Sequence, residues 1–332
     1  MFQTSAIGMQ RRTKVCQAYY LTGCTATGKS AVAHWLARRM GAAILSADSM
    51  LLYRGMDIGT AKPTPAERAE VPYAGLDLAT PGESCNLHLY YRAACTAVRR
   101  AVSRSQPLII VGGTGLYLQC LLQGLDRRPP PDPAWREEAE EILRVGGAPA
   151  LAARLREIAP EHWARLRDRN NPRRLMRAVE IARAAPDVPA AKTLPLPPPI
   201  PGLRLPPDQM QAAIAERARA MFDAGLLEET RGLLDAGLAD APTAGQAIGY
   251  AEAIACLRGE STVEEALERV IVRTRQLAKK QMTWFRHKLR VDWLEIDRKM
   301  PVEQRAGLVL AYWEKHGPVA VKVDNDEKNH SG

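Results

Sequence analysis

The sequence predicts an α/β fold: a parallel sheet with helices on both faces, and an all-helical domain inserted between two parts of that core. Three observations lead to this prediction. Short apolar runs alternate with stretches of helical periodicity over residues 15–113. A glycine-rich turn joins the first apolar run to the first helical stretch. Two proline-rich stretches then frame residues 134–184, whose pattern is helical throughout.

The predicted core elements follow one another in the order strand, helix, strand, helix, strand. Residues 15–22 (VCQAYYLT) and 42–48 (AAILSAD) are predicted strands, and residues 30–40 between them repeat apolar side chains at helical spacing. Residues 88–104 form the next predicted helix. The third strand, 107–113 (PLIIVGG), is almost continuously apolar, as expected for a parallel strand covered on both faces.

The carboxyl ends of these strands carry the segments suited to bind a ligand. Ligands of doubly wound sheets bind in the crevice beyond those ends. The glycine-rich turn at 23–30, Asp48 and the GGTG stretch at 112–115 all fall there. We therefore expect one crevice to collect all three.

The proline-rich stretches predict the domain boundaries. RRPPPDP at 127–133 ends the first part of the core, and LPLPPPIPGLRLPP lies within a second stretch, 186–207, expected to be loop or linker. The last residues are polar and expected to be disordered. The predicted division is core 1–126, helical insertion 127–205, core continuation with C-terminal helices 206–316 and tail 317–332.

The composition is that of a soluble globular protein. The chain has 332 residues, of which 46% are hydrophobic and 25% charged, and its net charge of +9 favours a polyanionic partner. The N-terminal residues lack an apolar run long enough for a signal peptide or a membrane span. The six cysteines form no CxxC pair, which is typical of reduced thiols in the cytoplasm. We expect a cytoplasmic monomer that has no membrane partner.

The turn GCTATGKS, Gly23 to Ser30, has the spacing of a phosphate-binding P-loop, with a predicted strand before it and a helix after it. Backbone N–H groups and the helix N-terminus offer positive potential to phosphate oxygens. Lys29 adds a point charge, and the hydroxyl of Ser30 can ligate Mg²⁺. The alternative is a glycine-rich turn that binds nothing.

The acidic residues expected at the crevice limit the reactions that the site could catalyse. An ATPase of this class also needs an Asp at the end of a buried strand, but the apolar strand 107–113 ends in glycines. This argues against simple nucleotide hydrolysis and leaves a small-molecule kinase or a transferase with a diphosphate leaving group. Asp48 is a candidate metal ligand or general base, or else the N-cap of a following helix.

Two zones rich in arginine and lysine indicate RNA as the polyanionic partner. Residues 273–290 contain seven Lys or Arg and no acid, with Trp284 and Phe285 interleaved. The alternative is a solvated basic helix that packs through these two aromatic side chains. No helix-turn-helix or zinc-finger pattern that would favour duplex DNA is present. The second zone contains Arg165, Arg167, Arg169, Arg173, Arg174 and Arg177.

Five stretches in one order resemble the signature segments of bacterial tRNA dimethylallyltransferases. They are SADSMLLYRGMDIGTAKP, IIVGGTGLYL, NNPRRLMRAVEI, QAIGYAEAI and TRQLAKKQMTWFR, and the similarity extends over about residues 17–294. The resemblance implies transfer of a dimethylallyl group from dimethylallyl diphosphate to the exocyclic amine of the adenosine that follows the anticodon. It also implies a requirement for Mg²⁺ and binding of the anticodon stem-loop of tRNA.

The resemblance also implies roles for individual residues. Asp48 would be the general base, while Thr25 and Arg217 would act on the diphosphate and Ser30 would lie near Mg²⁺. The loop that would bind the diphosphate, or a nucleotide such as ATP, comprises Gly23, Cys24, Thr25, Ala26, Thr27, Gly28, Lys29 and Ser30. Thr114 would lie against the target nucleotide. The positions that match tRNA-contacting segments are Asp48, Ser49, Met50, Leu51, Thr114, Arg173, Arg174, Arg177, Gln246, Gly249, Tyr250, Lys279, Lys280, Gln281, Trp284 and Arg286.

The chain departs from the family pattern at a few positions. Cys24 and Thr27 stand where Pro and Ser are usual; both are small, so the loop is expected to form. Leu51 stands where Gln is usual, and Ala251 where a basic residue is usual. Two rival hypotheses remain. A small-molecule kinase leaves both basic zones unexplained, and an inactive RNA-binding module is hard to reconcile with an intact Asp48 and phosphate loop.

Overall fold

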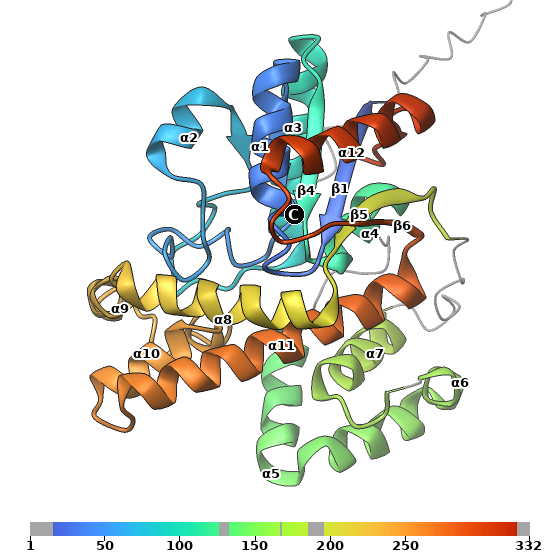
Figure 1. The fold of residues 1–332 in the computed structure, drawn as a ribbon. Coiled ribbons are helices and arrows are strands. Elements are labelled where there is room, and N and C mark those ends of the chain that lie inside the picture. Colours follow the sequence, from blue (N-terminus) through green and yellow to red (C-terminus); the bar gives the residue numbers. More distant parts are fainter. Residues whose placement is uncertain (1–15, 126–132, 167, 185–195, 324–332) are drawn as a thin grey trace, which may run out of the picture. The chain divides into compact units, whose positions relative to one another are not determined.

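The computed structural model describes residues 16–125, 133–166, 168–184 and 196–323 (Figure 1). The chain divides into two compact units: one comprises residues up to 125 and from 196 onward, and the other residues 126–195. In the described parts of the chain, no helix combines the length and apolar character needed to cross a bilayer.

A mainly parallel sheet organises the larger unit. Its strands lie in the order β3-β2-β4-β1-β5-β6, and β7 pairs antiparallel with the start of β1. The register aligns Thr22 with Gly112, and Ser46 with Val111, so the carboxyl ends of β1, β2 and β4 lie side by side. The strands are β1 (Gln17–Gly23), β2 (Ala43–Ser46), β3 (Tyr73–Ala74), β4 (Leu108–Gly112), β5 (Ile200–Arg204), β6 (Val291–Glu295) and β7 (Val319–Ala320).

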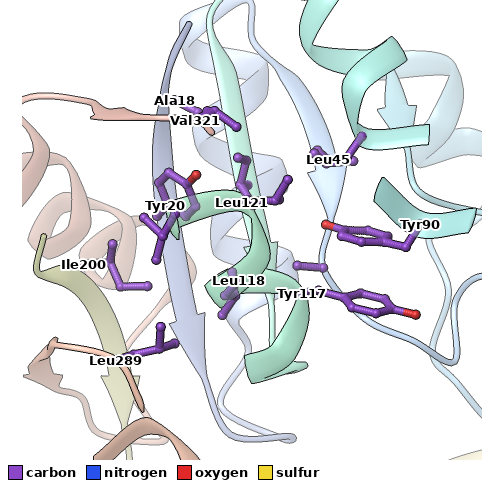
Figure 2. Close-up of a cluster of buried hydrophobic side chains, with 14 of the residues drawn as sticks. Ala18, Tyr20, Leu45, Tyr90, Tyr117, Leu118, Leu121, Ile200, Leu289 and Val321 are labelled. Atoms are coloured by element: carbon purple, nitrogen blue, oxygen red, sulfur yellow. The ribbon is translucent and has the colours of Figure 1, made fainter. Parts of the chain in front are cut away.

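Helices cover both faces of this sheet because alternate strand residues are apolar on both sides. Leu21, Ile44 and Ile109 pack against α1 (Lys29–Met40) and α12 (Val302–His316) on one face. On the other face, Tyr20 and Leu45 pack against α3 (Leu87–Ser103) and α4 (Gly115–Gln123). Figure 2 shows part of this second cluster. The α/β prediction, with its parallel sheet and its three predicted strands, is therefore confirmed.

The rest of the larger unit is a helical layer. Its four α-helices follow one another along the chain with no strand between them. It contains α8 (Pro207–Asp223), α9 (Leu226–Leu234), α10 (Tyr250–Leu257) and α11 (Val263–Lys288), with the short 3₁₀ helix Ala244–Gln246 before α10. Thr262 and Glu265 form a capping box that starts α11. A third buried cluster joins α9 and α10 to the segment after β2, through Tyr53, Leu226 and Tyr250. The short helix α2 (Pro65–Glu70) follows that segment.

The smaller unit is helical wherever it is described. It contains α5 (Pro133–Ile158), which is interrupted at Gly147 by a φ of 64°, α6 (Pro160–Arg165) and α7 (Pro172–Ala184). Trp135, Leu155 and Leu175 are fully buried in its core. The prediction of an inserted helical segment is confirmed.

Two predicted boundaries are wrong and one strand was missed, for a common reason. Residues 200–204, expected to be linker, form β5, and the compact unit 126–195 ends before the predicted 205. Residues 291–295 form β6, which was not predicted. Part of the tail 317–332, expected to be disordered, forms β7, while 324–332 lie outside the described residues. All three are stabilised by backbone hydrogen bonds to distant strands, which local composition does not reveal.

Gly112 is expected to be indispensable for folding. A methyl group there would lie 2.1 Å from the carbonyl oxygen of Ala47, a backbone atom that cannot move aside. We predict that Gly112→Ala lowers the free energy of unfolding by at least about 3 kcal/mol, measured by chemical denaturation. The matched control is Gly307→Ala in α12, where a methyl group meets nothing within 4 Å. That variant should be neutral or slightly stabilising; equal stability of both variants would contradict the prediction.

Candidate active site

The glycine-rich turn forms a tight loop between β1 and α1. Ala26 and Gly28 have φ values of 64° and 78°, which place them in the left-handed region. The side chain of Thr27, fully buried, donates a hydrogen bond to the carbonyl oxygen of Cys24 at 3.0 Å. Gly23 passes so close to β5 that a methyl group would lie 2.9 Å from the carbonyl oxygen of Leu203. The loop therefore forms with Cys24 and Thr27 at the positions of the usual Pro and Ser, as predicted.

Lys29 holds its ammonium group within this loop. The residue is 8% exposed, and its Nζ donates to the carbonyl oxygen of Cys24 at 3.2 Å. Burial lowers the pKa of Lys29, while the nearby carboxylate of Asp48 opposes that effect and the charge of Arg217 adds to it. Ser30, the next residue, is exposed, and it lines a pocket that the phosphate loop shares with Lys29.

Arg217 brings a second positive charge from α8. Its guanidinium donates to the hydroxyl of Thr25 at 3.2 Å and to the carbonyl oxygen of Thr60 at 3.3 Å. Burial lowers the pKa of Arg217, and the carboxylate of Asp48 opposes that effect. Two cations therefore face one carboxylate, which leaves a positive excess suited to an anion.

Asp48 follows β2 and lines the pocket with the loop, Lys29 and Arg217. Its Oδ1 accepts a hydrogen bond from the N–H of Met50 at 3.1 Å. No helix begins between residues 49 and 64, so the N-cap alternative for Asp48 is wrong. The carboxylate therefore belongs to the pocket.

The pocket combines charged and apolar side chains around a cavity of about 150 Å³. The phosphate loop, Asp48 and Arg217 supply its charged and polar groups, and apolar side chains supply much of the remaining lining. An anionic group and a small apolar group can thus lie side by side. The apolar lining comprises Ile44, Leu51, Ala61, Pro63, Tyr73 and Val111.

Helix α11 contributes Gln281, whose side chain joins the phosphate loop to the segment that follows β4. Its Oε1 accepts from the N–H of Thr25 at 2.9 Å, and its Nε2 donates to the carbonyl oxygen of Gly113 at 3.1 Å. Gln281 was predicted to contact tRNA; its amide is hydrogen-bonded at both ends within the protein, and the tRNA contact stays a prediction. Nothing in the sequence signals this bridge, because it joins residues 256 positions apart.

Residues after β2 and β4 hold each other in place. The hydroxyl of Thr114 accepts from the N–H of Ser49 at 3.0 Å and donates to the hydroxyl of Ser49 at 3.4 Å. Met50 packs against the cluster of Tyr53, and Leu51 is 9% exposed at the pocket wall. The ring of Trp284 lies against Gly115, where a methyl group would be 2.1 Å from it. The predicted nucleotide contacts of these residues stay predictions.

The remaining residues predicted to bind tRNA divide into exposed and buried ones. Tyr250 is fully buried, and Gly249 beside it is also buried, so neither residue offers a surface that an RNA could contact. This corrects the prediction for both residues. Phe285 is 1% exposed and packs in the core, which excludes it as a stacking platform. The exposed members in the larger unit are Gln246, Lys279, Lys280 and Arg286.

In the smaller unit, Arg173 and Arg174 are exposed on α7. Arg177 instead forms an ion pair of 2.9 Å with Glu180, whose side chain is 1% exposed and also pairs with Arg136. Arg177 therefore stabilises the unit by compensating a buried carboxylate, a role that the sequence did not predict. Arg167 lies outside the described residues.

Comparison with known proteins identifies the family to which this arrangement belongs. Residues 51–288 match the model of the IPP transferase family, and residues 16–82 match the isopentenyl transferase model. The chain belongs to the IPP transferase family. The tRNA dimethylallyltransferase of Corynebacterium jeikeium is 40% identical over 288 residues, covering 85% of this chain and 92% of that protein. The Thermus thermophilus protein of the same name is 42% identical, covering 80% and 88%.

Solved structures show the same fold as this IPP transferase. The tRNA isopentenylpyrophosphate transferase of Bacillus halodurans aligns with a TM-score of 0.64 at 32% identity, covering 90% of this chain and 97% of that one. A eukaryotic dimethylallyltransferase acting on tRNA aligns with a TM-score of 0.72 at 21% identity, a likeness that concerns the fold alone.

Gln281 is expected to order the phosphate loop. In Gln281→Leu, both hydrogen bonds of the bridge are removed and the N–H of Thr25 no longer has its partner. We predict an affinity for inorganic diphosphate about tenfold weaker, measured by calorimetric titration with Mg²⁺. Gln276→Leu, at an exposed position of the same helix, is the control and should bind as the native protein does. Equal weakening in both variants would contradict the role of the bridge.

Proposed function

We propose that this chain transfers the dimethylallyl group of dimethylallyl diphosphate to the exocyclic amine of the adenosine immediately 3′ of a tRNA anticodon. One observation carries the proposal: Asp48 shares a pocket with the phosphate loop, Lys29 and Arg217, and apolar side chains line the same pocket. A diphosphate suits the cations and a five-carbon group suits the apolar lining. The names of the relatives supply the acceptor class.

The reaction forms an N–C bond, breaks a C–O bond and moves one proton from the amine to a base. The adenosine N6 attacks C1 of the prenyl group, and the C1–O bond breaks with its electron pair passing to the diphosphate. Lys29, Arg217 and the N–H groups of the loop stabilise the charge that develops on that leaving group. Asp48 takes the proton lost from the amine. The apolar lining excludes water, which would otherwise compete for the prenyl carbon.

Mg²⁺ fits this pocket as an ion shared with the substrate. Among the described residues there is no group of three or more His, Cys, Asp or Glu side chains able to hold a metal. Mg²⁺ usually keeps several waters and binds through substrate phosphates with one or two protein ligands. The exposed hydroxyl of Ser30 would be its ligand here. The ion would supply further neutralisation of the leaving diphosphate.

The exposed basic residues are suited to the acceptor RNA. Lys279, Lys280 and Arg286 lie exposed on α11, the helix that also carries Gln281 into the site, and Arg173 and Arg174 lie exposed on α7. An adenosine within a stacked loop cannot place N6 beside Asp48, so the base has to leave its stack. The kinase hypothesis leaves these exposed basic residues without a role.

Asp48→Asn should abolish transfer and leave tRNA binding intact. The amide keeps the size of the side chain but cannot take a proton, so we predict a loss of kcat of at least about 10³-fold. The measurement is incorporation of labelled dimethylallyl diphosphate into tRNA, with filter binding of tRNA in parallel. Asp235→Asn, at an exposed position, is the control. Retained transfer, or a large loss of tRNA binding, would overturn the role of Asp48.

Lys279 and Lys280 are expected to neutralise RNA phosphates in a manner that depends on salt. Removing both charges in Lys279→Ala/Lys280→Ala should weaken tRNA binding. It should also reduce the slope of log affinity against log salt by about 0.7 to 0.9 for each phosphate that is no longer neutralised. Binding is measured at several salt concentrations. Lys315→Ala, exposed on α12, should leave the slope unchanged; an unchanged slope in the double variant would exclude a role for these two lysines.

A further inference from the structure

The segment that follows Met56 passes through the site without secondary structure of its own. Residues 57–60 lead to Ala61 and Pro63, which line the pocket, and Thr60 supplies the carbonyl oxygen that accepts from Arg217. A loop held only by its own backbone would not keep that carbonyl in one place.

One carboxylate on α9 holds three consecutive N–H groups of this loop. Glu229 accepts from the N–H of Asp57 at 3.1 Å, of Ile58 at 2.8 Å and of Gly59 at 3.4 Å. Such charge-assisted bonds are the stronger kind, and together they fix the direction of three successive peptides. The loop is therefore shaped by a side chain 170 or more residues away in the sequence.

Tyr250, at the start of α10, contacts the same loop. Glu229 and Tyr250, with their hydrogen bonds to residues 57–59, are called the clamp below. The hydroxyl of Tyr250 donates to Glu229 at 2.5 Å and accepts from the N–H of Gly59 at 3.2 Å. The ring is fully buried, and a methyl group on Gly59 would lie 2.4 Å from it. Burial raises the pKa of Tyr250, and the hydrogen bond to Glu229 raises it further, so the phenol stays protonated and keeps donating.

The clamp lies one residue away from the contact that orients Arg217. Gly59 is held by Glu229 and Tyr250, and the next residue, Thr60, accepts from Arg217. The guanidinium has its second partner in Thr25 of the phosphate loop. If the loop moves, Arg217 loses the Thr60 carbonyl as a partner. An unsatisfied N–H on a partly buried guanidinium is unfavourable, so the side chain of Arg217 is then expected to change its orientation.

We propose that Glu229, with Tyr250, is a positioning residue of the reaction: it fixes residues 57–60 so that the Thr60 carbonyl aims Arg217 at the diphosphate. This inference deepens the proposed function, because it rests on Arg217 binding the leaving group. A role confined to packing would lower stability and leave the binding of diphosphate by the folded protein unchanged.

The test is a double-mutant cycle on the full chain, with inorganic diphosphate and Mg²⁺ as the titrated probe. Glu229→Gln should weaken diphosphate binding about tenfold. The amide is neutral and has one acceptor oxygen, so it cannot replace the carboxylate that accepts from three N–H groups and the phenol. Arg217→Gln should weaken it about a hundredfold. The double variant should bind as Arg217→Gln alone does, because Glu229 acts through Arg217. Effects that multiply, or no effect of Glu229→Gln, would overturn the proposal.

Two further variants keep the result interpretable. Glu228→Gln alters the neighbouring side chain, which is 71% exposed, and should change nothing. Tyr250→Phe removes only one hydroxyl and should weaken diphosphate binding about threefold. If Glu229→Gln does not fold, Tyr250→Phe takes its place in the double-mutant cycle with Arg217→Gln. Thermal unfolding of each variant identifies loss of the fold; a Tyr250→Phe protein that is folded and binds normally would refute the clamp.

Prenyl transfer to tRNA separates this inference from the proposed function. With dimethylallyl diphosphate as donor, Glu229→Gln should raise the donor KM more than it lowers kcat, and tRNA affinity should stay constant. If the native protein transfers no prenyl group while Glu229→Gln still weakens diphosphate binding through Arg217, the proposed function fails and the clamp stands. If transfer proceeds normally in both proteins, the clamp fails and the function stands.

Discussion

Positive charge withdrawn from water, at the edge where three parallel strands end, is the constraint on which this site depends. Keeping Lys29 and Arg217 out of water is unfavourable unless polar groups compensate them. The compensation is incomplete: the carbonyls of Cys24 and Thr60 and the hydroxyl of Thr25 accept their hydrogen bonds, and Asp48 supplies one negative charge. The proposed diphosphate would therefore meet groups that are already in place, with little reorganisation.

Long-range contacts hold these groups in place. Arg217 meets Thr25 across 192 residues of sequence, and Gln281 meets the same residue across 256. The buried thiol of Cys24 adds a third link, donating to the carbonyl oxygen of Ala278 on α11 at 3.5 Å. Burial raises the pKa of Cys24 to about 11, so it stays a protonated donor near neutral pH. The phosphate loop is thus tied both to the sheet and to the helix whose outer face carries Lys279 and Lys280.

Leu51 gives the pocket a different character from the family pattern. A side chain that offers only apolar surface lies where a Gln is usual, at a wall shared with Ile44 and Val111. Such a wall suits the proposed prenyl group and offers no hydrogen bond to a base edge. Ser49 and Thr114, both predicted to contact the acceptor nucleotide, are hydrogen-bonded to each other.

The sequence by itself determined the local features: three of the buried strands, the place of the phosphate loop, the mainly helical character of the described parts of 134–184, and the position of Asp48 at a strand end. These follow from periodicity, glycine and proline positions and short motifs, which act within a few residues. Only the tertiary structure decided that 200–204 is a strand, that Gln281 and Tyr250 point inward, that Arg177 neutralises Glu180 and that Glu229 holds the loop before Thr60. Apart from the Arg177–Glu180 pair, whose partners are three residues apart on α7, each of these depends on hydrogen bonds between residues that lie far apart along the chain.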